Sequence, residues 1–504
     1  MKILFRLDAN KQIGAGHFER CFAIAKGIQA THKTSNLSIV FACSLLPKKY
    51  KDRLQDSGIK YIPLPVLQTQ SEDAIYLKNQ LEAKVDLLCV DHYSLADEWE
   101  SSIREKCKKL LVIDDLANRK HGDIDFLLDQ TFNRTEAAYY DFVSQKTTFL
   151  LGSPYALLRQ EFYTIRNSKR PSKRSIDPPR KIVLALGAMN HAGSTNILVE
   201  FLATLRKSYN LSFSVTILLS SQANELSSLK ESIKKLPYIT LKEDCTNVGV
   251  VYSEADLAIG ACGTSSWERC ALGLPSLTVT LADNQNEIAR QLDEYGAHLY
   301  LGHIKDMTFS AFESAFMMLS QTPSLLEEMS KKALQICDGK GVANLIRKVG
   351  VANIFLKKAT TQDIKTVFKW QSNPVIRQFS RNPNPISWSE HQEWMKAALK
   401  SNTRHIYIIR SKTHLDDLSV GMLRLDEHLD GYEISILVDE KFQNQNIAIN
   451  AIKSIPEQFL LKKIYATVST ANKASQNLFT KAGFKKVEAD LFVLKNKKEL
   501  INEE

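Results

Sequence analysis

The most constraining feature of the chain is an apolar run followed by a glycine-rich turn and a helical pattern. Residues 3–5 are Ile-Leu-Phe, which is typical of a buried first strand. Apolar side chains then recur at positions 18, 22 and 25, as they do on one face of a helix. Gly14 and Gly16 allow a tight bend between the two. The pattern predicts a strand, a turn and a helix, with His17 in the first helical turn.

His17 is a candidate proton carrier because of its place at this turn. Free amides at a helix start attract a phosphate or another anion, and an imidazole exchanges protons near neutral pH. We therefore expect His17 to lie beside a bound anionic substrate. An ordinary strand-to-helix turn with an exposed histidine explains the same residues, so this short motif does not decide the function alone.

The alternation of strands and helices extends over about 165 residues and then starts again. Such alternation is typical of βαβ units. A basic segment with several prolines, residues 166–180, separates the two series and indicates an exposed linker. Two α/β lobes joined by a linker predict a ligand site in a cleft between them. Strands are expected at 37–41, 87–90, 110–113, 181–186, 215–219, 255–260 and 277–279.

Polar residues follow two strands of the first series. Asp91 follows the strand at 87–90, and Asp114 and Asp115 follow the strand at 110–113. Open α/β sheets bind ligands at such strand ends. Helix capping and turn chemistry account for Asp114 and Asp115 equally well.

The composition is that of a globular protein with several domains. The chain has 504 residues, which is too long for a single core. Of these residues, 44% are hydrophobic and 24% are charged. A net charge of +10 favours anionic substrates, including nucleotide-sugars and coenzyme A, and no nucleic-acid motif accompanies the basic runs. The 8 cysteines form no Cys-x-x-Cys pair, so we expect no metal site and no disulfide framework. No signal-peptide pattern or membrane-spanning run is present, which predicts a cytoplasmic protein without a membrane partner.

The second lobe resembles the nucleotide-binding half of two-lobed sugar-nucleotide enzymes. Amides and hydroxyls at a helix start bind a diphosphate, and a carboxylate such as that of Glu268 accepts the hydroxyls of a ribose. Glu268 taken alone also fits a solvated helix residue. The residues that carry the resemblance are Gly263, Thr264, Ser265, Ser266, Glu268, Gly273, Pro275, Asn284 and Gln285.

The first lobe is similar to the UDP-sugar hydrolases of pseudaminic acid synthesis, and the resemblance extends to about residue 350. It is carried by residues 6–8 (Arg-Leu-Asp), 14–21 and 155–162. It implies hydrolysis of UDP-2,4-diacetamido-2,4,6-trideoxy-β-L-altropyranose with inversion. The implied site comprises His17 and Asp8 as catalytic residues and Gly14, Gly16 and Arg159 as substrate contacts. Residues 187–190 (Gly-Ala-Met-Asn) depart from the Gly-Gly-x-Asp type turn that is frequent in the family, which affects the contacts of this loop.

The remaining residues, from about 351, follow a new order of elements that resembles GNAT-type N-acetyltransferases. Helices are expected around 363–371 and 389–399, and strands at 405–409, 419–425, 432–438 and 464–469. The most specific part is the run Asn-x-x-Ser-x-x-Leu-Phe-x-x-x-Gly-Phe at 472–484. The resemblance implies acetyl-CoA as co-substrate. Its implied binding residues are Val438, Gln443, Asn444, Gln445, Asn446, Ile447, Ala448, Asn472 and Phe479.

Two departures from the acetyltransferase pattern concern chemistry. Asn444 and Asn446 replace the inner glycines of the pyrophosphate loop, and Asn is the non-glycine residue best able to adopt left-handed backbone. Phe479 stands where many members have a tyrosine acid, so it cannot protonate the leaving thiolate. The general base is open among Glu433, His391 and Glu393.

These patterns together predict an α/β protein with two Rossmann-like lobes of glycosyltransferase-B type, at 1–165 and 166–350, followed by a GNAT-type domain at 351–504. Trp370, Asn373, His391 and Trp394 resemble amino-sugar acetyltransferases, one of which precedes the hydrolase in the pseudaminic acid pathway. We therefore expect one enzyme that acetylates the 4-amine of UDP-4-amino-4,6-dideoxy-N-acetyl-β-L-altrosamine and then hydrolyses the product. Two alternatives stay open: a glycosyltransferase with a separate acceptor, and a hydrolase with a non-catalytic acetyltransferase-like scaffold. The oligomeric state is not determined by the sequence.

Overall fold

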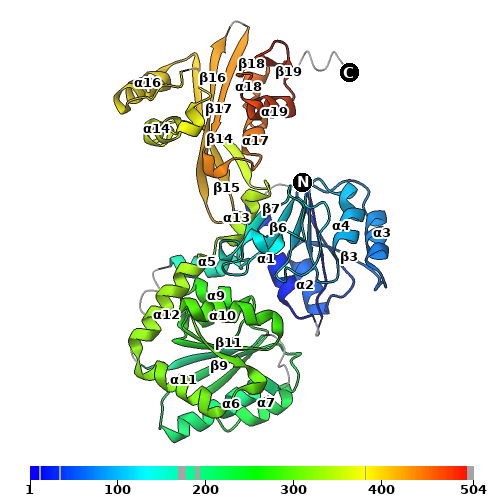
Figure 1. The fold of residues 1–504 in the computed structure, drawn as a ribbon, viewed down its shortest axis with the longest axis vertical. Coiled ribbons are helices and arrows are strands. Elements are labelled where there is room, and N and C mark those ends of the chain that lie inside the picture. The colour runs from blue at the N-terminus through cyan, green and yellow to red at the C-terminus, as the bar shows by residue number, and fades with distance from the viewer. Residues whose placement is uncertain are drawn as a thin grey trace. The chain divides into compact units, whose positions relative to one another are not determined.

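The chain divides into two compact units (Figure 1). The first comprises Met1–Gln29 and Thr34–Leu345, and the second Ala30–Lys33 and Ile346–Glu504. The structure is a computed structural model. It describes residues 1–10, 13–32, 36–168, 178–187, 193–380, 382–428 and 430–495.

A parallel sheet of seven strands, in the order β3-β2-β1-β4-β5-β6-β7, forms the first lobe of the first unit in the part of the chain that the structure describes. Helices cover it, and an apolar core that includes Leu4, Leu88 and Trp99 packs between sheet and helices. The strands are β1 (Lys2–Leu7), β2 (Ser38–Cys43), β3 (Lys60–Pro63), β4 (Leu87–Asp91), β5 (Leu110–Ile113), β6 (Phe126–Asp129) and β7 (Thr148–Leu151). The helices are α1 (Gly16–Thr31), α2 (Lys48–Asp56), α3 (Gln70–Gln80) and α4 (Asp97–Ile103).

A second parallel sheet, with six strands among the described residues, forms the second lobe in the order β10-β9-β8-β11-β12-β13. Its strands are β8 (Lys181–Ala185), β9 (Ser214–Leu219), β10 (Ile239–Glu243), β11 (Leu257–Ala261), β12 (Ser276–Thr280) and β13 (Leu299–His303). Its helices are α6 (Ser194–Ser208), α7 (Leu226–Ile233), α8 (Val248–Glu254), α9 (Ser265–Ala271), α10 (Asn286–Tyr295), α11 (Phe309–Gln321) and α12 (Pro323–Ile336). The prediction of two doubly wound lobes is thereby confirmed.

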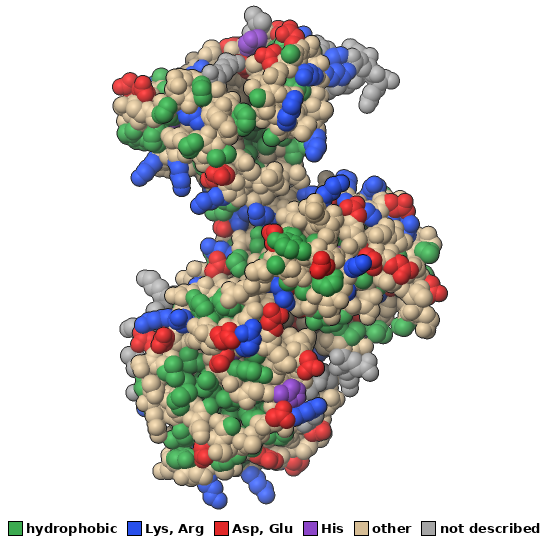
Figure 2. Space-filling model, in the orientation of Figure 1, with side chains coloured by type: hydrophobic (Ala, Val, Ile, Leu, Met, Phe, Trp, Pro, Cys, Tyr) green, Lys and Arg blue, Asp and Glu red, His purple; other side chains and the backbone are tan. Residues whose placement is uncertain are grey.

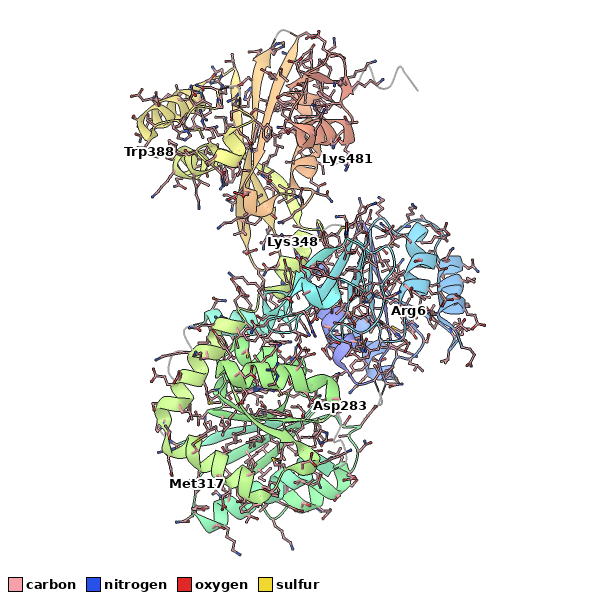
Figure 3. The ribbon with its side chains drawn as sticks, viewed as in Figure 1. Arg6, Asp283, Met317, Lys348, Trp388 and Lys481 are labelled. Atoms are coloured by element: carbon pink, nitrogen blue, oxygen red, sulfur yellow. The ribbon has the colours of Figure 1, made fainter. Side chains whose placement is uncertain are left out.

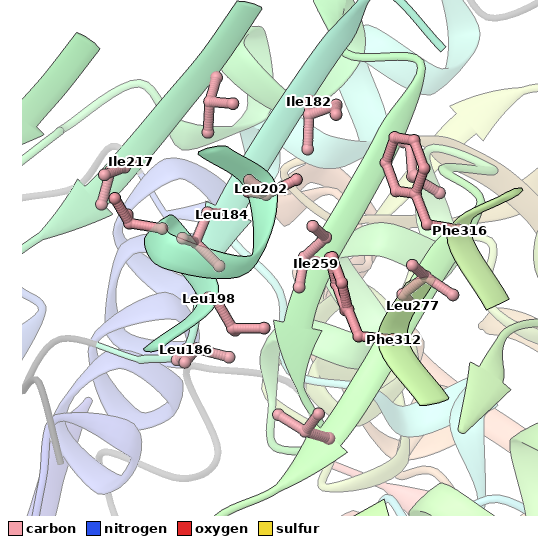
Figure 4. Close-up of a cluster of buried hydrophobic side chains, with 14 of the residues drawn as sticks. Ile182, Leu184, Leu186, Leu198, Leu202, Ile217, Ile259, Leu277, Phe312 and Phe316 are labelled. Atoms are coloured by element: carbon pink, nitrogen blue, oxygen red, sulfur yellow. The ribbon is translucent and has the colours of Figure 1, made fainter. Parts of the chain in front are cut away.

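Strand β8 shows why this sheet is apolar on both faces. Side chains alternate between faces along a strand. Ile182 and Leu184 therefore join one core, with Phe312 and Phe316 of α11 (Figure 4), whereas Val183 packs in the other core. A continuous apolar run is the pattern expected of a strand that is covered on both sides.

Two chain segments connect the lobes. The segment that includes α5 (Gln160–Asn167) leaves the first lobe, and α13 (Gly341–Lys348) returns alongside it, where Asn344 donates to Pro154 O. Arg166, which we expected in an exposed linker, belongs to α5, and its guanidinium donates to the carbonyls of Ala271 and Cys337. Residues 169–177 of that linker lie outside the described residues, as do 188–190 of the departing turn at 187–190.

The second unit is built on a mixed sheet in the order β14-β15-β16-β17-β18-β20-β19, over the residues that the structure describes. β17 and β18 run parallel but pair only at Gly431–Glu433, after which the strands diverge. The strands are β14 (Asn353–Lys358), β15 (Arg404–Lys412), β16 (Asp417–His428), β17 (Gly431–Val438), β18 (Lys463–Thr467), β19 (Lys485–Lys486) and β20 (Leu491–Leu494). The helices are α14 (Ile364–Gln371), α15 (Pro374–Arg377), α16 (Trp388–Lys400), α17 (Ile447–Lys453), α18 (Glu457–Leu460) and α19 (Lys473–Lys481).

The surface carries charges of both signs. Basic and acidic side chains are interspersed on the face that Figure 2 shows. Trp388, at the start of α16, is 42% exposed and packs edge-on against Phe368 (Figure 3). None of the described helices combines the length and the apolar character needed to span a bilayer.

Gly341 is expected to be the least replaceable glycine at the junction of the lobes. A Cβ at this position would lie 2.0 Å from the carbonyl oxygen of Ala156, and a backbone overlap cannot be relieved by side-chain rotation. Gly341→Ala should lower the free energy of unfolding by about 3 kcal/mol or more in urea titrations of the full chain. Gly296→Ala is the control, since a Cβ there meets open space and only the positive φ of +80° opposes it. An equal loss in both variants would contradict the steric argument.

Candidate active site

A pocket of the first unit lies where both parallel sheets change their winding direction. In the first sheet this point falls between β1 and β4, and in the second between β8 and β11. Ligands of open α/β sheets bind outside the carboxyl ends of strands at such points. The pocket has about 600 Å³ of space, part of it open to solvent. Of the residues predicted from sequence, it is lined by Gly16, His17, Gly263, Thr264, Asn284 and Gln285.

His17 is held in one orientation by Asp91, the last residue of β4. Its Nδ1 lies 2.5 Å from Asp91 Oδ1, and both side chains are buried. An ionised carboxylate only accepts hydrogen bonds, so Nδ1 carries the donated proton. In the neutral ring Nε2 is then the acceptor. Because His17 lines the pocket, the pair supplies the pocket with a base of fixed tautomer.

Arg20, one helical turn after His17, fixes the other side of Asp91. Its Nε and Nη2 donate to the two oxygens of Asp91 at 2.5 and 2.6 Å, and its Nη1 donates to Asp115 at 2.8 Å. Burial raises the pKa of Asp91, but Arg20 and then His17 outweigh burial and hold that pKa far below its ordinary value. Asp91 therefore stays ionised and orients the imidazole. Tyr93 completes this wall, with its ring edge-on to His17 and its hydroxyl donating to Asp115 at 3.0 Å.

The second lobe supplies the opposite wall. A Cβ on Gly16 would lie 4.0 Å from Thr264 Oγ1, so the glycine turns of the two lobes face each other across the pocket. Gly263 has open space where a side chain would be. Asn284 and Gln285 lie in a short helical turn after β12 and extend this wall.

Two buried polar atoms of pocket residues have no hydrogen-bond partner among the described residues. They are Nε1 of Trp267 in the second lobe and Oγ1 of Thr131 in the first. The two side chains are 0% and 1% exposed. An unmade hydrogen bond of a buried group costs about 1–3 kcal/mol.

Asp8, expected to be catalytic, is not among the residues that line the pocket. Its carboxylate accepts the amides of Ser44 and Leu45 and pairs with Arg6 and His92. Burial raises the pKa of Asp8, but the hydrogen bond from His92 and the charge of Arg6 outweigh burial and lower the pKa to about 2. These contacts tie the loop after β2 to the end of β1, and a catalytic role for Asp8 stays a prediction.

Other predicted contacts shape the turns instead of lining the pocket. Gly14 has a φ of +84°, and its amide donates to Asn10 O at 2.9 Å, which closes the turn before α1. The hydroxyls of Ser265 and Ser266 accept from the guanidinium of Arg269 at 3.1 Å each.

Arg159 and Glu268 pair with each other outside the pocket lining. Arg159 Nη2 lies 3.5 Å from Glu268 Oε1 and 3.0 Å from Glu161 Oε1. Burial raises the pKa of Glu268 to about 7 against the pull of Arg159, and the nearby Glu19 and Glu161 add to the rise. Glu268 therefore exchanges a proton near neutral pH. Its contact with a ribose stays a prediction.

The loop at 443–448 in the second unit keeps the shape expected of it. Asn444 and Asn446 adopt left-handed backbone, with φ of +61° and +56°, so the prediction that asparagine replaces glycine conformationally is confirmed. Successive backbone amides in such a loop form an anion-binding concavity. Gln443 Nε2 donates to Val438 O at 3.4 Å, which ties the loop to the end of β17.

Three residues assigned to the acetyl-CoA site by resemblance serve the scaffold. Phe479 and Ile447 are 4% and 3% exposed and belong to the apolar core. Asn472 caps α19, since its Oδ1 accepts the amide of Ser475 at 3.0 Å. Phe479 therefore supports the site through packing.

The candidates for the general base of the second unit differ in placement. His391 is 3% exposed and its Nε2 bonds to Ile364 O at 3.0 Å, so it is a core histidine. Glu433 accepts from Thr467 Oγ1 at 2.8 Å, at the point where β17 and β18 diverge. Glu393 is exposed on α16. Over the described parts of the chain, no three His, Cys, Asp or Glu side chains are grouped to hold a metal ion.

Both parts of the chain are similar to known proteins. Residues 353–485 match the family model of the acetyltransferase (GNAT) domain. The UDP-2,4-diacetamido-2,4,6-trideoxy-beta-L-altropyranose hydrolase of Campylobacter jejuni is 37% identical over 175 residues, which are 34% of this chain and 57% of that protein. The chain joins a segment similar to this hydrolase to a GNAT acetyltransferase domain.

Two further relatives align over longer stretches. A Methanocaldococcus jannaschii protein named "Uncharacterized protein MJ1062" is 23% identical over 503 residues, 96% of this chain and 97% of its own. The spore coat polysaccharide biosynthesis protein SpsG of Bacillus subtilis is 24% identical over 348 residues, 66% of this chain and 94% of its own. The first of these relatives therefore spans both the hydrolase-like segment and the acetyltransferase domain.

Several residues of the hydrolase-like site were not assigned from sequence. Asp91 stood out only as a polar residue after a strand, and its pairing with His17 depends on the adjacency of β1 and β4. Arg20 lies three residues after His17, a spacing that places both on one helix face. Thr131 and Trp267 had no signal in the sequence, because their unpaired atoms are a property of the folded pocket.

The raised pKa of Glu268 predicts that stability falls as the pH rises. The ordinary pKa of a Glu side chain is 4.5, and the pKa of Glu268 in the folded protein is about 7. Between these two pH values the folded protein holds a proton on Glu268 that the unfolded chain has released. Glutamine does not ionise, so Glu268→Gln should not lose stability as the pH rises. Its free energy of unfolding at pH 8 should exceed that of the wild type by roughly 3 kcal/mol. Urea unfolding at pH 5 and pH 8 measures the difference, with Glu294→Gln on the exposed face of α10 as control. Parallel pH profiles in wild type and Glu268→Gln would contradict the assignment.

Proposed function

We propose that the acetyltransferase domain acetylates the amine of a UDP-amino-sugar and that the hydrolase-like segment then releases UDP from the product. The observation that carries the second step is the orientation of His17 by Asp91 at a pocket formed by both lobes. The hydrolase similarity supports UDP-2,4-diacetamido-2,4,6-trideoxy-β-L-altropyranose as the hydrolysed sugar. Its precursor with a free 4-amine is then the acetyl acceptor.

In the hydrolytic step, His17 Nε2 takes a proton from water. The water oxygen attacks the anomeric carbon, the bond from that carbon to the phosphate oxygen breaks, and UDP leaves with the electron pair. Attack on the face opposite UDP inverts the anomeric configuration. Asp91 stays ionised and stabilises the imidazolium that forms. Arg20 keeps Asp91 in place, and the imidazolium then releases its proton to solvent.

In the acetyl-transfer step, the sugar amine attacks the thioester carbonyl of acetyl-CoA. The carbon–sulfur bond breaks with its electron pair on sulfur, so CoA leaves as a thiolate that takes a proton from solvent; the acetyl group stays on nitrogen, and the nitrogen loses a proton. The GNAT match supports acetyl-CoA as donor. The amides around Asn444 and Asn446 are the groups that would hold its pyrophosphate. Glu433, at the divergence of β17 and β18, is the candidate that would take the proton.

Loss of His17 should abolish hydrolysis while UDP binding survives. His17→Ala is expected to lower kcat by about 10²-fold or more, the usual effect of a lost acid–base group. UDP release from the diacetylated sugar, with calorimetry for UDP, measures both properties. His121→Gln is the matched control: this buried histidine pairs with Glu100 and does not line the pocket, so its loss should leave kcat unchanged.

Reaction in ¹⁸O-water distinguishes the proposed mechanism from its rivals. The label should enter the free sugar and not UDP. Near-normal turnover by His17→Ala, or label in UDP, would refute the assignment of His17 to attack at carbon. Release of UDP only after a sugar or lipid acceptor is added would favour a glycosyltransferase.

Replacement of Asn446 should affect acetyl transfer alone. A β-branched residue resists the φ of +56°, so Asn446→Val is expected to reduce acetyl transfer by roughly tenfold or more while hydrolysis continues. Asn446→Gly is the control, because glycine adopts this backbone freely. Mass spectrometry of products with and without acetyl-CoA measures both activities. Equal acetylation by the Val and Gly variants would argue for a scaffold domain without turnover.

A further inference from the structure

The second-lobe wall of the pocket is built over a buried arginine. Arg269 lies on α9 and is 2% exposed. Its Nη1 donates to Ser265 Oγ at 3.1 Å, and its Nη2 donates to Ala261 O at 3.0 Å and Ser266 Oγ at 3.1 Å. All three acceptors are neutral oxygens of the turn that leads from β11 into α9. The guanidinium therefore holds the backbone and the two serine side chains of this turn in place through hydrogen bonds.

The charge of Arg269 has no ion-pair partner within the described part of the chain. The adjacent carboxylate, Glu268, pairs with Arg159 instead. Burial of a charge without a counter-charge is costly. The charge of Arg269 also acts on His298 in the same lobe. Burial lowers the pKa of His298 to about 3, and the positive charge of Arg269 contributes to that decrease. The charge of Arg269 also acts to lower the pKa of Glu268, but no carboxylate among the described residues lies within ion-pair distance of its guanidinium.

A glycine provides the space for the guanidinium. A Cβ on Gly260 of β11 would lie 2.6 Å from Arg269 Nη1 and 3.1 Å from Cζ. Gly260 lies in a strand and needs no left-handed backbone, so the requirement at this position is steric. Any other residue would displace the charge from beneath the turn.

The same helix presents an unused donor to the pocket. Trp267 lies two residues before Arg269, lines the pocket and is 0% exposed, and its Nε1 has no hydrogen-bond partner among the described residues. A buried cation that contacts no carboxylate directly and an unpaired N–H donor in one wall both favour an acceptor that carries negative charge. A diphosphate has both properties.

We propose that Arg269 is a positioning residue that makes this wall selective for the diphosphate of a nucleotide, which supplies the missing counter-charge. The inference rests on the proposed function. Arg269 acts through the turn: Ser265 and Ser266 accept hydrogen bonds from the guanidinium, and the residues just before and after them, Thr264 and Trp267, line the pocket. The charge also favours UDP as a leaving group, because negative charge grows on the phosphate oxygen as the bond to carbon breaks.

Calorimetry of the full chain with UDP, UMP and uridine tests the proposal. Arg269→Met and Gly260→Ala should each weaken UDP binding by roughly tenfold or more and leave uridine binding within about twofold. Arg269→Lys should retain most of the affinity for UDP. Arg206→Met is the matched control, since Arg206 belongs to the same lobe, donates to Phe213 O at 2.6 Å and does not line the pocket. A merely structural role would weaken all three ligands together.

Two results would overturn the inference: an equal loss of UDP and uridine affinity, or unchanged UDP affinity in both Arg269→Met and Gly260→Ala. If Arg269→Met fails to fold, Gly260→Ala and Arg269→Lys decide the outcome. If the pocket does not bind a UDP-sugar, as the proposed function requires, the result looks different, because the wild-type chain would then bind none of the three ligands. If the wild type binds UDP and the variants bind it equally well, the proposed role of Arg269 is wrong but the proposed function is not.

Discussion

The hydrolase-like site depends on one buried ion, the carboxylate of Asp91. A carboxylate at 0% exposure is stable only if its oxygens are fully engaged. Arg20 and His17, one helical turn apart on α1, provide those partners. The sheet order that sets β4 beside β1 is therefore also the condition for the site, because it brings the end of β4 under the first turn of α1. The imidazole of His17 gains its orientation from an interaction that also stabilises the lobe.

The parts of the fold that could be predicted from sequence are those set by local pattern. β1, the turn at Gly14 and α1 follow from consecutive residues, as does the left-handed backbone of Asn444 and Asn446. The strands β3, β6, β7, β10 and β13 were missed, because runs of four or five residues carry little periodicity and their strand form depends on neighbours in the sheet, whereas the wholly apolar β5 was predicted.

The site was predictable to the extent that its residues belong to turns. His17 and Thr264 were found in this way and line the pocket. The partner of His17 lies 74 residues away, and only the strand order brings it close. Asp8 was assigned to catalysis by the resemblance alone; its four partners use the carboxylate to hold a loop, and its catalytic role stays a prediction.

Some groups that weaken the folded state line this pocket or lie next to residues that line it. Trp267 and Thr131 have polar atoms without partners in the described chain, Arg269 is a buried cation without a counter-ion there, and Glu268 is a carboxyl that burial drives toward neutrality. Away from the pocket, the cores around β8 follow ordinary packing rules. Polar groups without partners are expected at a site where a bound ligand supplies the missing interactions. Their chemistry, two donors and a cation near a base of fixed tautomer, is that of a pocket for a polar, anionic substrate that is attacked by water.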